Sequence, residues 1–488
     1  MAALTVARVR GTPIALALLL AVAAIHGTAW AIVMAPWNGP DEVAHFAYAE
    51  HLAETGHGPQ RNGGTGSQST AENSALFPLN LYPIRLQPGA KPNYSELPRT
   101  KIGRAGELPD SARKDGSGPN SAANYPPLYY TYEAVAYRIS PWRSELGRLF
   151  TMRLFTVALF VLTVGLTWCI AGELLAAGWA RALATALVAL QPKLASGAGM
   201  VNPDLMLVAL ATGELLAAVR IVRRGPTARA VIALAACSAG GVLTHPRGYF
   251  LVPFAVIALG VAAWSFRERR VWTLAAGAVA GAAMVLAVAG AMAWVGAHTG
   301  TGGAGAGTGS PSIAGFNMRQ FLSYVWQFYL PKLTFMNTKV GPPYGYRQVY
   351  IESFFGNFAS FSVNYRLVYY DALQVGAALG IVGLYTTVVA RWRTVIANWP
   401  VVVLSVTFFV GLMGLLHLVS YLSLRTGPDP VITGRYLLPA VALYGVAAAW
   451  VCASLPRRIG LPLAGVLLGA AILLAVGGVG LSAERFYA

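Results

Sequence analysis

The chain of 488 residues is too hydrophobic for a soluble protein, since 56% of its residues are hydrophobic, 11% are charged and its mean hydropathy is +0.54. Acidic and basic side chains are equally numerous within residues 36–148, so the formal net charge of +17 arises in the rest of the chain. Much of it lies in short arginine-rich loops. Such loops follow the positive-inside rule of proteins embedded in a lipid bilayer and exclude a nucleic-acid partner. The three cysteines lie in apolar runs and predict neither a disulfide nor a zinc site.

The first apolar run predicts a membrane helix near residues 12–35 that carries the chain out of the cytoplasm. It is followed by Trp37-Asn38-Gly39-Pro40-Asp41-Glu42-Val43-Ala44-His45, so two adjacent carboxylates lie where the chain leaves the hydrocarbon. Pro40 favours an extended Gly39, and Asp41 can then cap a helix on which Asp41, His45 and Tyr48 share one side. Two interpretations explain this pattern: a helix cap that begins an interfacial helix, or a catalytic motif.

Residues 36–147 are predicted to form a first external loop, whose middle is rich in glycine, proline, asparagine and serine. The loop closes with Asn124-Tyr125-Pro126-Pro127-Leu128-Tyr129-Tyr130, which predicts a rigid turn that opens an interfacial helix. An aromatic belt at headgroup depth explains these tyrosines as well.

Placing the arginine-rich loops in the cytoplasm predicts ten further membrane helices. They lie near residues 148–171, 177–192, 203–222, 228–243, 249–265, 271–297, 371–390, 399–423, after 433 and 460–481. The fold class is therefore an all-α polytopic membrane protein with about 11 transmembrane helices, in which residues 1–488 form a single integral membrane domain. Residues 298–370 are predicted to form a second external loop with an interfacial helix. The C terminus is expected on the external side.

Charged residues gather at the external ends of these predicted helices, where membrane proteins usually carry few cations. A planar guanidinium suits phosphate oxygens, and a carboxylate can take a proton from a hydroxyl or bind a divalent cation. The pattern predicts transfer from a phosphate-linked lipid to a hydroxyl acceptor, although capping alone explains Asp204 and snorkelling alone explains Arg247. The candidate residues are Asp41, Glu42, His45, Tyr125, Lys193, Asp204, His245, Arg247, Arg347, Arg425, Arg435 and Tyr436.

Several of these motifs resemble the GT-C superfamily of membrane glycosyltransferases, notably the Asp-Glu pair after the first helix, Tyr125-Pro126-Pro127, Asn202-Pro203-Asp204 and Thr244-His245-Pro246-Arg247. More narrowly, Pro40–Phe46, Ser353-Phe354-Phe355-Gly356 and Gly434-Arg435-Tyr436-Leu437-Leu438-Pro439 resemble a bacterial family of predicted membrane proteins with a domain of unknown function.

The resemblance implies GT-C-like architecture and a sugar moved from a polyprenyl-phosphate donor to a glycan or glycolipid of the cell envelope, with inversion. It places the site on the external, periplasmic face of the bacterial cytoplasmic (inner) membrane. By that likeness Asp41 would be the base, and Glu42 would orient the acceptor or a metal. No cofactor is certain; a divalent cation (Mg²⁺, Mn²⁺ or Ca²⁺) would have Asp41, Glu42 and Asp204 as its ligands.

Two other classes of function remain open at this point. A lipid-linked substrate transporter or flippase would place ionisable residues near the bilayer midplane, where this chain offers only the isolated Glu214 and His417. A non-catalytic scaffold would not require the acidic and arginine-rich segments to meet.

Overall fold

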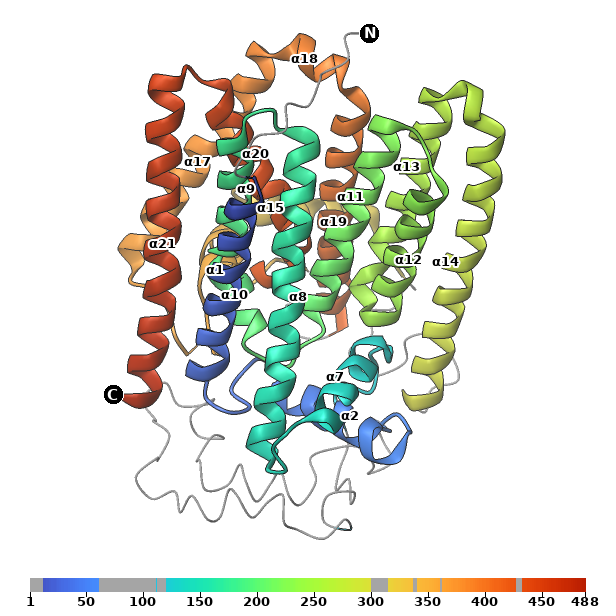
Figure 1. Ribbon diagram of the computed structural model, residues 1–488, viewed down its shortest axis with the longest axis vertical. Coiled ribbons are helices and arrows are strands. Elements are labelled where there is room, and N and C mark those ends of the chain that lie inside the picture. Colours follow the sequence, from blue (N-terminus) through green and yellow to red (C-terminus); the bar gives the residue numbers. More distant parts are fainter. Residues whose placement is uncertain are drawn as a thin grey trace.

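The computed structural model describes residues 12–60, 111, 120–299, 315–336, 340–359, 362–426 and 432–488 (Figure 1). In this part of the chain the regular structure is helical, apart from one isolated bridge between Phe358 and Val363. This confirms the predicted all-α class. The middle of the first predicted external loop and the opening of the second lie outside the described residues.

Within these ranges nine helical stretches are long and apolar enough to cross a membrane. They comprise α1 (Thr12–Val33), α8 (Glu145–Leu174), α11 (Asp204–Arg224), η2 with α13 (Pro246–Phe250, Leu251–Ser265), α14 (Arg270–Thr299) after the short η3 (Arg267–Arg269), α17 (Leu367–Ala390), α19 (Trp399–Thr426), η5 with α20 (Gly434–Ala440, Val441–Ser454) and α21 (Arg457–Tyr487).

Two of the eleven predicted membrane helices are shorter than this. The predicted helix at 177–192 is α9 (Gly178–Ala189), which has 12 residues and is followed by the separate short helix α10 (Pro192–Ala198). The break falls at Gln191 because Pro192 has no N–H and is best placed at the start of a new helix. The predicted helix at 228–243 is α12 (Ala228–Thr244), with 17 residues. The count of eleven is therefore not confirmed.

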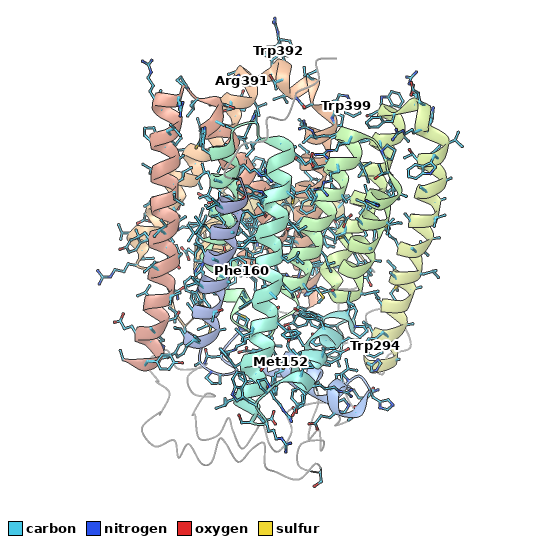
Figure 2. The ribbon with its side chains drawn as sticks, in the orientation of Figure 1. Met152, Phe160, Trp294, Arg391, Trp392 and Trp399 are labelled. Atoms are coloured by element: carbon cyan, nitrogen blue, oxygen red, sulfur yellow. The ribbon has the colours of Figure 1, made fainter. Side chains whose placement is uncertain are left out.

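Short helices cover the two ends of the bundle. At one end lie α2 (Glu42–Thr55) and α7 (Leu128–Ile139), and at the other lies α18 (Trp392–Ala397). Figure 2 shows Arg391 and Trp392 at the end opposite to Met152 and Trp294. The arginine-rich turns before α12, α14 and α21 lie at the α18 end, so the charge asymmetry read from the sequence is present in the fold (Figure 1).

The centre of the bundle is α11, most of whose membrane-crossing stretch is buried, whereas α14, α17 and α21 expose long rows of apolar side chains. Such rows suit lipid-facing helices, since hydrocarbon replaces the missing protein neighbours. The remaining described elements, α15 (Met318–Tyr329), η4 (Arg347–Glu352) and α16 (Ser353–Phe355), follow α14 in the chain. Of these, α16 and η4 pack against η5 and α15 packs against α19.

Candidate functional site

The turn that leaves α1 is held by a buried guanidinium. Arg153 of α8 donates to the carbonyl oxygens of Ala31, Met34 and Ala35 at 2.7–3.0 Å, which satisfies carbonyls left open at the end of α1. The same side chain binds both oxygens of Glu42, at 2.8 Å from Nε and 2.7 Å from Nη2. Sequence reasoning missed Arg153, although an arginine inside an otherwise apolar helix was a signal that could have revealed it.

The Glu42 side chain is fully buried and is occupied on both oxygens. Besides Arg153 it accepts from the backbone N–H of Gly39 at 3.2 Å and of Val201 at 3.0 Å. Together these contacts fasten the turn after α1 to α8 and to the segment before α11. They suit a positioning role for Glu42 better than the predicted contact with acceptor or metal.

Asp41, by contrast, points outward, with 57% of its side chain exposed. It stands at the N-cap of α2 in the left-handed backbone conformation (φ 60°), and its side chain makes no capping hydrogen bond. Its Oδ2 lies 3.5 Å from Nη2 of Arg435. The predicted cap position is thus correct, but the carboxylate faces a cation instead of the helix.

Buried Asp204 and two partly buried arginines form an ionic cluster beside Asp41. Oδ1 of Asp204 accepts from Nη2 of Arg247 at 2.8 Å, and its Oδ2 lies 3.7 Å from Nε of Arg435. The three residues come from the start of α11, from η2 and from η5. Asn202 joins this cluster to the Asp41 turn, because its side chain donates to the Pro40 carbonyl and accepts from the Asp204 amide.

Tyr436 lies between the two arginines of the cluster. The guanidinium carbon of Arg247 is 3.4 Å from the centre of the Tyr436 ring, and Nη2 of Arg435 donates to the Tyr436 hydroxyl at 3.0 Å. Stacking and the hydrogen bond hold both planar groups in a defined orientation. The cations are therefore arranged by packing as well as by charge.

An aromatic wall lies beside the cluster and carries little charge. The rings of His45 and His245 meet Tyr125 edge-on, at 5.4 and 4.9 Å between ring centres, and His45 Nδ1 lies 2.8 Å from the Tyr130 hydroxyl. Burial lowers the pKa of His45 to about 4, against the opposing effect of the Asp41 charge. His45 is therefore neutral near pH 7, and the positive charge next to Asp41 comes from arginine.

Lys193 approaches the cluster from α10. Its Nζ donates to the Asn357 carbonyl at 2.5 Å, and it lies 5.8 Å from the centre of the Phe358 ring. Burial, followed by the positive charge of Arg435, lowers the pKa of Lys193 to about 7, against the attraction of Asp204. The predicted residue is therefore near the site but is already bound to the segment after α16.

The Gly-Arg-Tyr turn is placed by a close contact with the Ser353 segment. A Cβ on Gly434 would lie 2.3 Å from both the Val349 carbonyl oxygen and the Phe354 nitrogen, so only glycine fits. The Gly434 amide donates to Ser353 Oγ at 2.5 Å. Two motifs that are far apart in the sequence are thus in direct contact, and this contact positions Arg435.

Two predicted arginines lie elsewhere. Arg347 binds Glu352 at 3.0 Å and Asp371 at 2.7 Å, next to α17. Arg425 lies in the last turn of α19, near Gly315. The contacts of the described residues place neither of them in the ionic cluster.

The three carboxylates named as metal ligands do not fit a cation in this arrangement. Glu42 is neutralised by Arg153, and Asp204 lies between Arg247 and Arg435, so only Asp41 presents an exposed carboxylate. Within the described ranges, no group of three or more histidine, cysteine, aspartate or glutamate side chains is placed to hold a metal ion.

Comparison with known proteins places the chain in a family and finds distant structural likenesses. Residues 24–444 match the family described as "Predicted membrane protein (DUF2142)", and no curated protein matches the chain. The chain is similar to the crystal structure of ArnT from Cupriavidus metallidurans bound to undecaprenyl phosphate, with 14% identity, 96% of this chain and 74% of that chain covered, and a TM-score of 0.47.

It is also similar to the oligosaccharyltransferase of Archaeoglobus fulgidus in the apo form, with 11% identity, 96% of this chain and 56% of that chain covered, and a TM-score of 0.48. At this level of likeness the function has to be inferred from the residues of this chain itself.

Proposed function

The chain belongs to the DUF2142 family of predicted membrane proteins, and from that premise we propose that it is a membrane glycosyltransferase. It moves a sugar from a polyprenyl-phosphate donor to a hydroxyl of a cell-envelope glycan or glycolipid. The observation that carries the proposal is an exposed carboxylate, Asp41, held 3.5 Å from Arg435 at the rim of a cluster with two arginines and one buried counter-ion.

Asp41 is the general base in this proposal. The acceptor hydroxyl gives its proton to the Asp41 carboxylate while its oxygen forms the new bond to C1 of the sugar. The bond between C1 and the phosphate oxygen breaks in the same step, and its electron pair leaves with the polyprenyl phosphate. Attack opposite to the leaving group inverts the configuration at C1.

Arg247 and Arg435 are the groups that bind the phosphate of the donor. A guanidinium can offer two parallel N–H donors to phosphate oxygens, and its attraction grows as the phosphate gains charge on leaving. Asp204 and Tyr436 fix the orientation of both arginines before the donor arrives, so little reorganisation is needed. Tyr125 and His45 provide an uncharged wall against which a sugar ring can pack.

The membrane orientation belongs to the same proposal. The arginine-rich turns lie opposite to α2 and α7 (Figure 1), and by the positive-inside rule this supports a site on the external, periplasmic side of the cytoplasmic membrane. There it is accessible to lipid-linked donors and to envelope acceptors.

The test replaces Asp41 by asparagine and measures sugar transfer by the purified protein. The donors are synthetic polyprenyl-phosphate hexoses and pentoses, and a lipid extract supplies acceptors. Asparagine tolerates the left-handed backbone but cannot take the proton, so turnover should fall on the order of 10²–10⁴-fold with unchanged folding.

Asp371→Asn is the matched control, because Asp371 is similarly exposed and also faces an arginine, but outside the cluster. Near-wild-type turnover in Asp41→Asn would remove Asp41 from the reaction. Transbilayer movement of intact donor in vesicles, without any sugar transfer, would instead support a transporter or flippase.

A further inference from the structure

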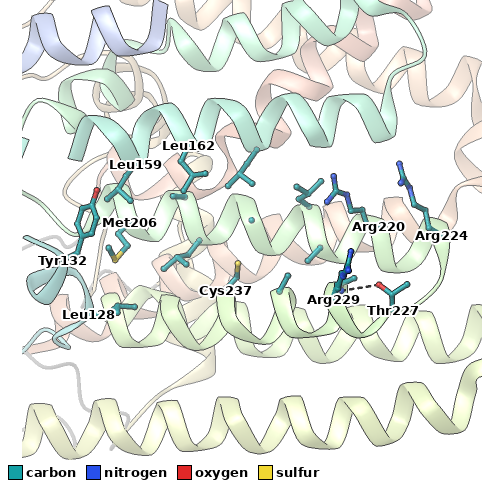
Figure 3. A pocket seen from close by; sticks show the side chains of 18 of the residues that line it. Leu128, Tyr132, Leu159, Leu162, Met206, Arg220, Arg224, Thr227, Arg229 and Cys237 are labelled. Carbon is teal, nitrogen blue, oxygen red and sulfur yellow. Dashed lines mark hydrogen bonds between the residues drawn. The ribbon is translucent and has the colours of Figure 1, made fainter. Parts of the chain in front are cut away.

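A long apolar groove runs along α11 between α8 and α12, and nothing in the proposed reaction uses it (Figure 3). Its volume is about 930 Å³. Leu128 and Tyr132 of α7 lie at one end, and Arg220, Arg224 and Arg229 lie at the other. Between these ends the lining is almost entirely apolar.

The groove opens onto the surrounding hydrocarbon. Val135 and Leu162, each about half exposed, form part of its rim. Small residues on the two facing helices, among them Gly213, Ala217 and Ala233, leave room for a chain-like ligand. Because apolar surface in a membrane is covered by lipid chains, the shape selects an amphiphile with at least one long chain.

The charges at the two ends of the groove are unequal. Arg220 and Arg224 share a single carboxylate, Glu173, at 3.2 and 2.7 Å. Arg229 stands in the first turn of α12, which contains no acidic residue, and the helix dipole adds positive charge there. Among the described residues no ion pair is recorded for Arg229. The arginine end therefore carries net positive charge, whereas no cation is found among the described residues that line the α7 end.

We propose that this groove binds an anionic phospholipid from the leaflet at the arginine-rich face. Its phosphate lies at Arg229 and Arg224, and an acyl chain follows α11 toward Tyr132. The charge distribution decides this orientation, because a donor lipid serving the ionic cluster needs its phosphate at the opposite end.

Occupation of the groove would also support the site indirectly. Met206 lines the groove two residues after Asp204, and Tyr132 lines it two residues after Tyr130, which contacts His45. A bound chain would therefore pack against α11, which carries Asp204, and against α7, whose Tyr130 contacts His45.

The test is native mass spectrometry of the purified full-length protein titrated with phosphatidylglycerol, phosphatidylcholine or a polyprenyl phosphate. Phosphatidylglycerol should bind about fivefold more tightly than phosphatidylcholine, since one arginine near the membrane surface contributes roughly that factor. Arg229→Gln should remove this preference. Arg267→Gln is the control, because Arg267 lies at the same face of the bundle but does not line the groove.

A second variant tests the chain-binding part. Ala233→Trp fills the groove from an exposed position and should lower the affinity for both phospholipids at least fivefold. Ala236→Trp is the control on the same helix, since Ala236 is exposed but is not part of the lining. Equal affinity for the two phospholipids, or phosphatidylglycerol binding that survives both Arg229→Gln and Ala233→Trp, would overturn the proposal. Displacement of phosphatidylglycerol by polyprenyl phosphate, together with loss of polyprenyl phosphate binding in Ala233→Trp, would also overturn the proposal. The groove would then bind the donor lipid.

Discussion

The two aspartates of the site illustrate how surroundings decide the role of a residue. Asp204 is buried between Arg247 and Arg435, where its charge offsets the repulsion that would otherwise separate two guanidinium groups. Asp41 faces Arg435 from an exposed position. One carboxylate therefore suits a structural counter-ion, and the other suits a group that meets substrate.

A prediction at the scale of single residues concerns the shape of the two cations. We expect Arg247→Lys and Arg435→Lys each to weaken donor binding on the order of tenfold, although the charge is kept, because one ammonium cannot replace two parallel N–H donors. The measurement is the affinity of the purified protein for polyprenyl phosphate.

Arg347→Lys is the matched control, since Arg347 pairs with Glu352 and Asp371 outside the cluster. If donor affinity is unchanged in both cluster variants and falls in the control, the phosphate is bound near α17 instead.

At the scale of elements, one ion pair joins three segments. Glu42 and Arg153 connect the turn after α1 to α8, and the Val201 amide brings in the segment before α11. Removal of one partner leaves the other charge buried without compensation, which is far more costly than loss of an exposed pair.

We therefore expect Glu42→Gln to lower the free energy of unfolding on the order of 3–5 kcal/mol, seen as a lower Tm of the detergent-solubilised protein. Glu352→Gln, which removes a partly exposed partner of Arg347, should change it by about 1 kcal/mol or less. If Glu42→Gln leaves the Tm unchanged but abolishes sugar transfer, the result would instead support the prediction that Glu42 acts in the reaction.

At the scale of the whole molecule, the arginine-rich turns lie at one end of the bundle, and α2, which directly follows Asp41, lies at the other (Figure 1). The described end of α21 lies on the side of α2 and α7. The eleven-helix topology requires both α9 and α12 to cross with their neighbours, although each is short for a membrane span.

Reporter fusions at Arg224, Arg269 and Ala488 test this orientation. They should report cytoplasm, cytoplasm and the external side, because the short basic loops stay inside. A cytoplasmic signal at Ala488 would mean that one of the short helices does not cross the bilayer.

The sequence by itself determined the class of the fold and most of the long helices, because apolar runs that are interrupted by charges report directly on contact with lipid. It also indicated Asp41, Asp204, Arg247 and Arg435, since charged residues at the ends of membrane helices are costly and few.

Only the tertiary structure decided what each charge faces. Glu42 and Arg153 are 111 positions apart, and neither residue predicts the other. Asp41 and Glu42 are adjacent and chemically alike, yet the start of α2 directs one outward and the other into the protein. The physical reason is that hydropathy depends on each residue's own side chain, whereas partners depend on how distant helices pack.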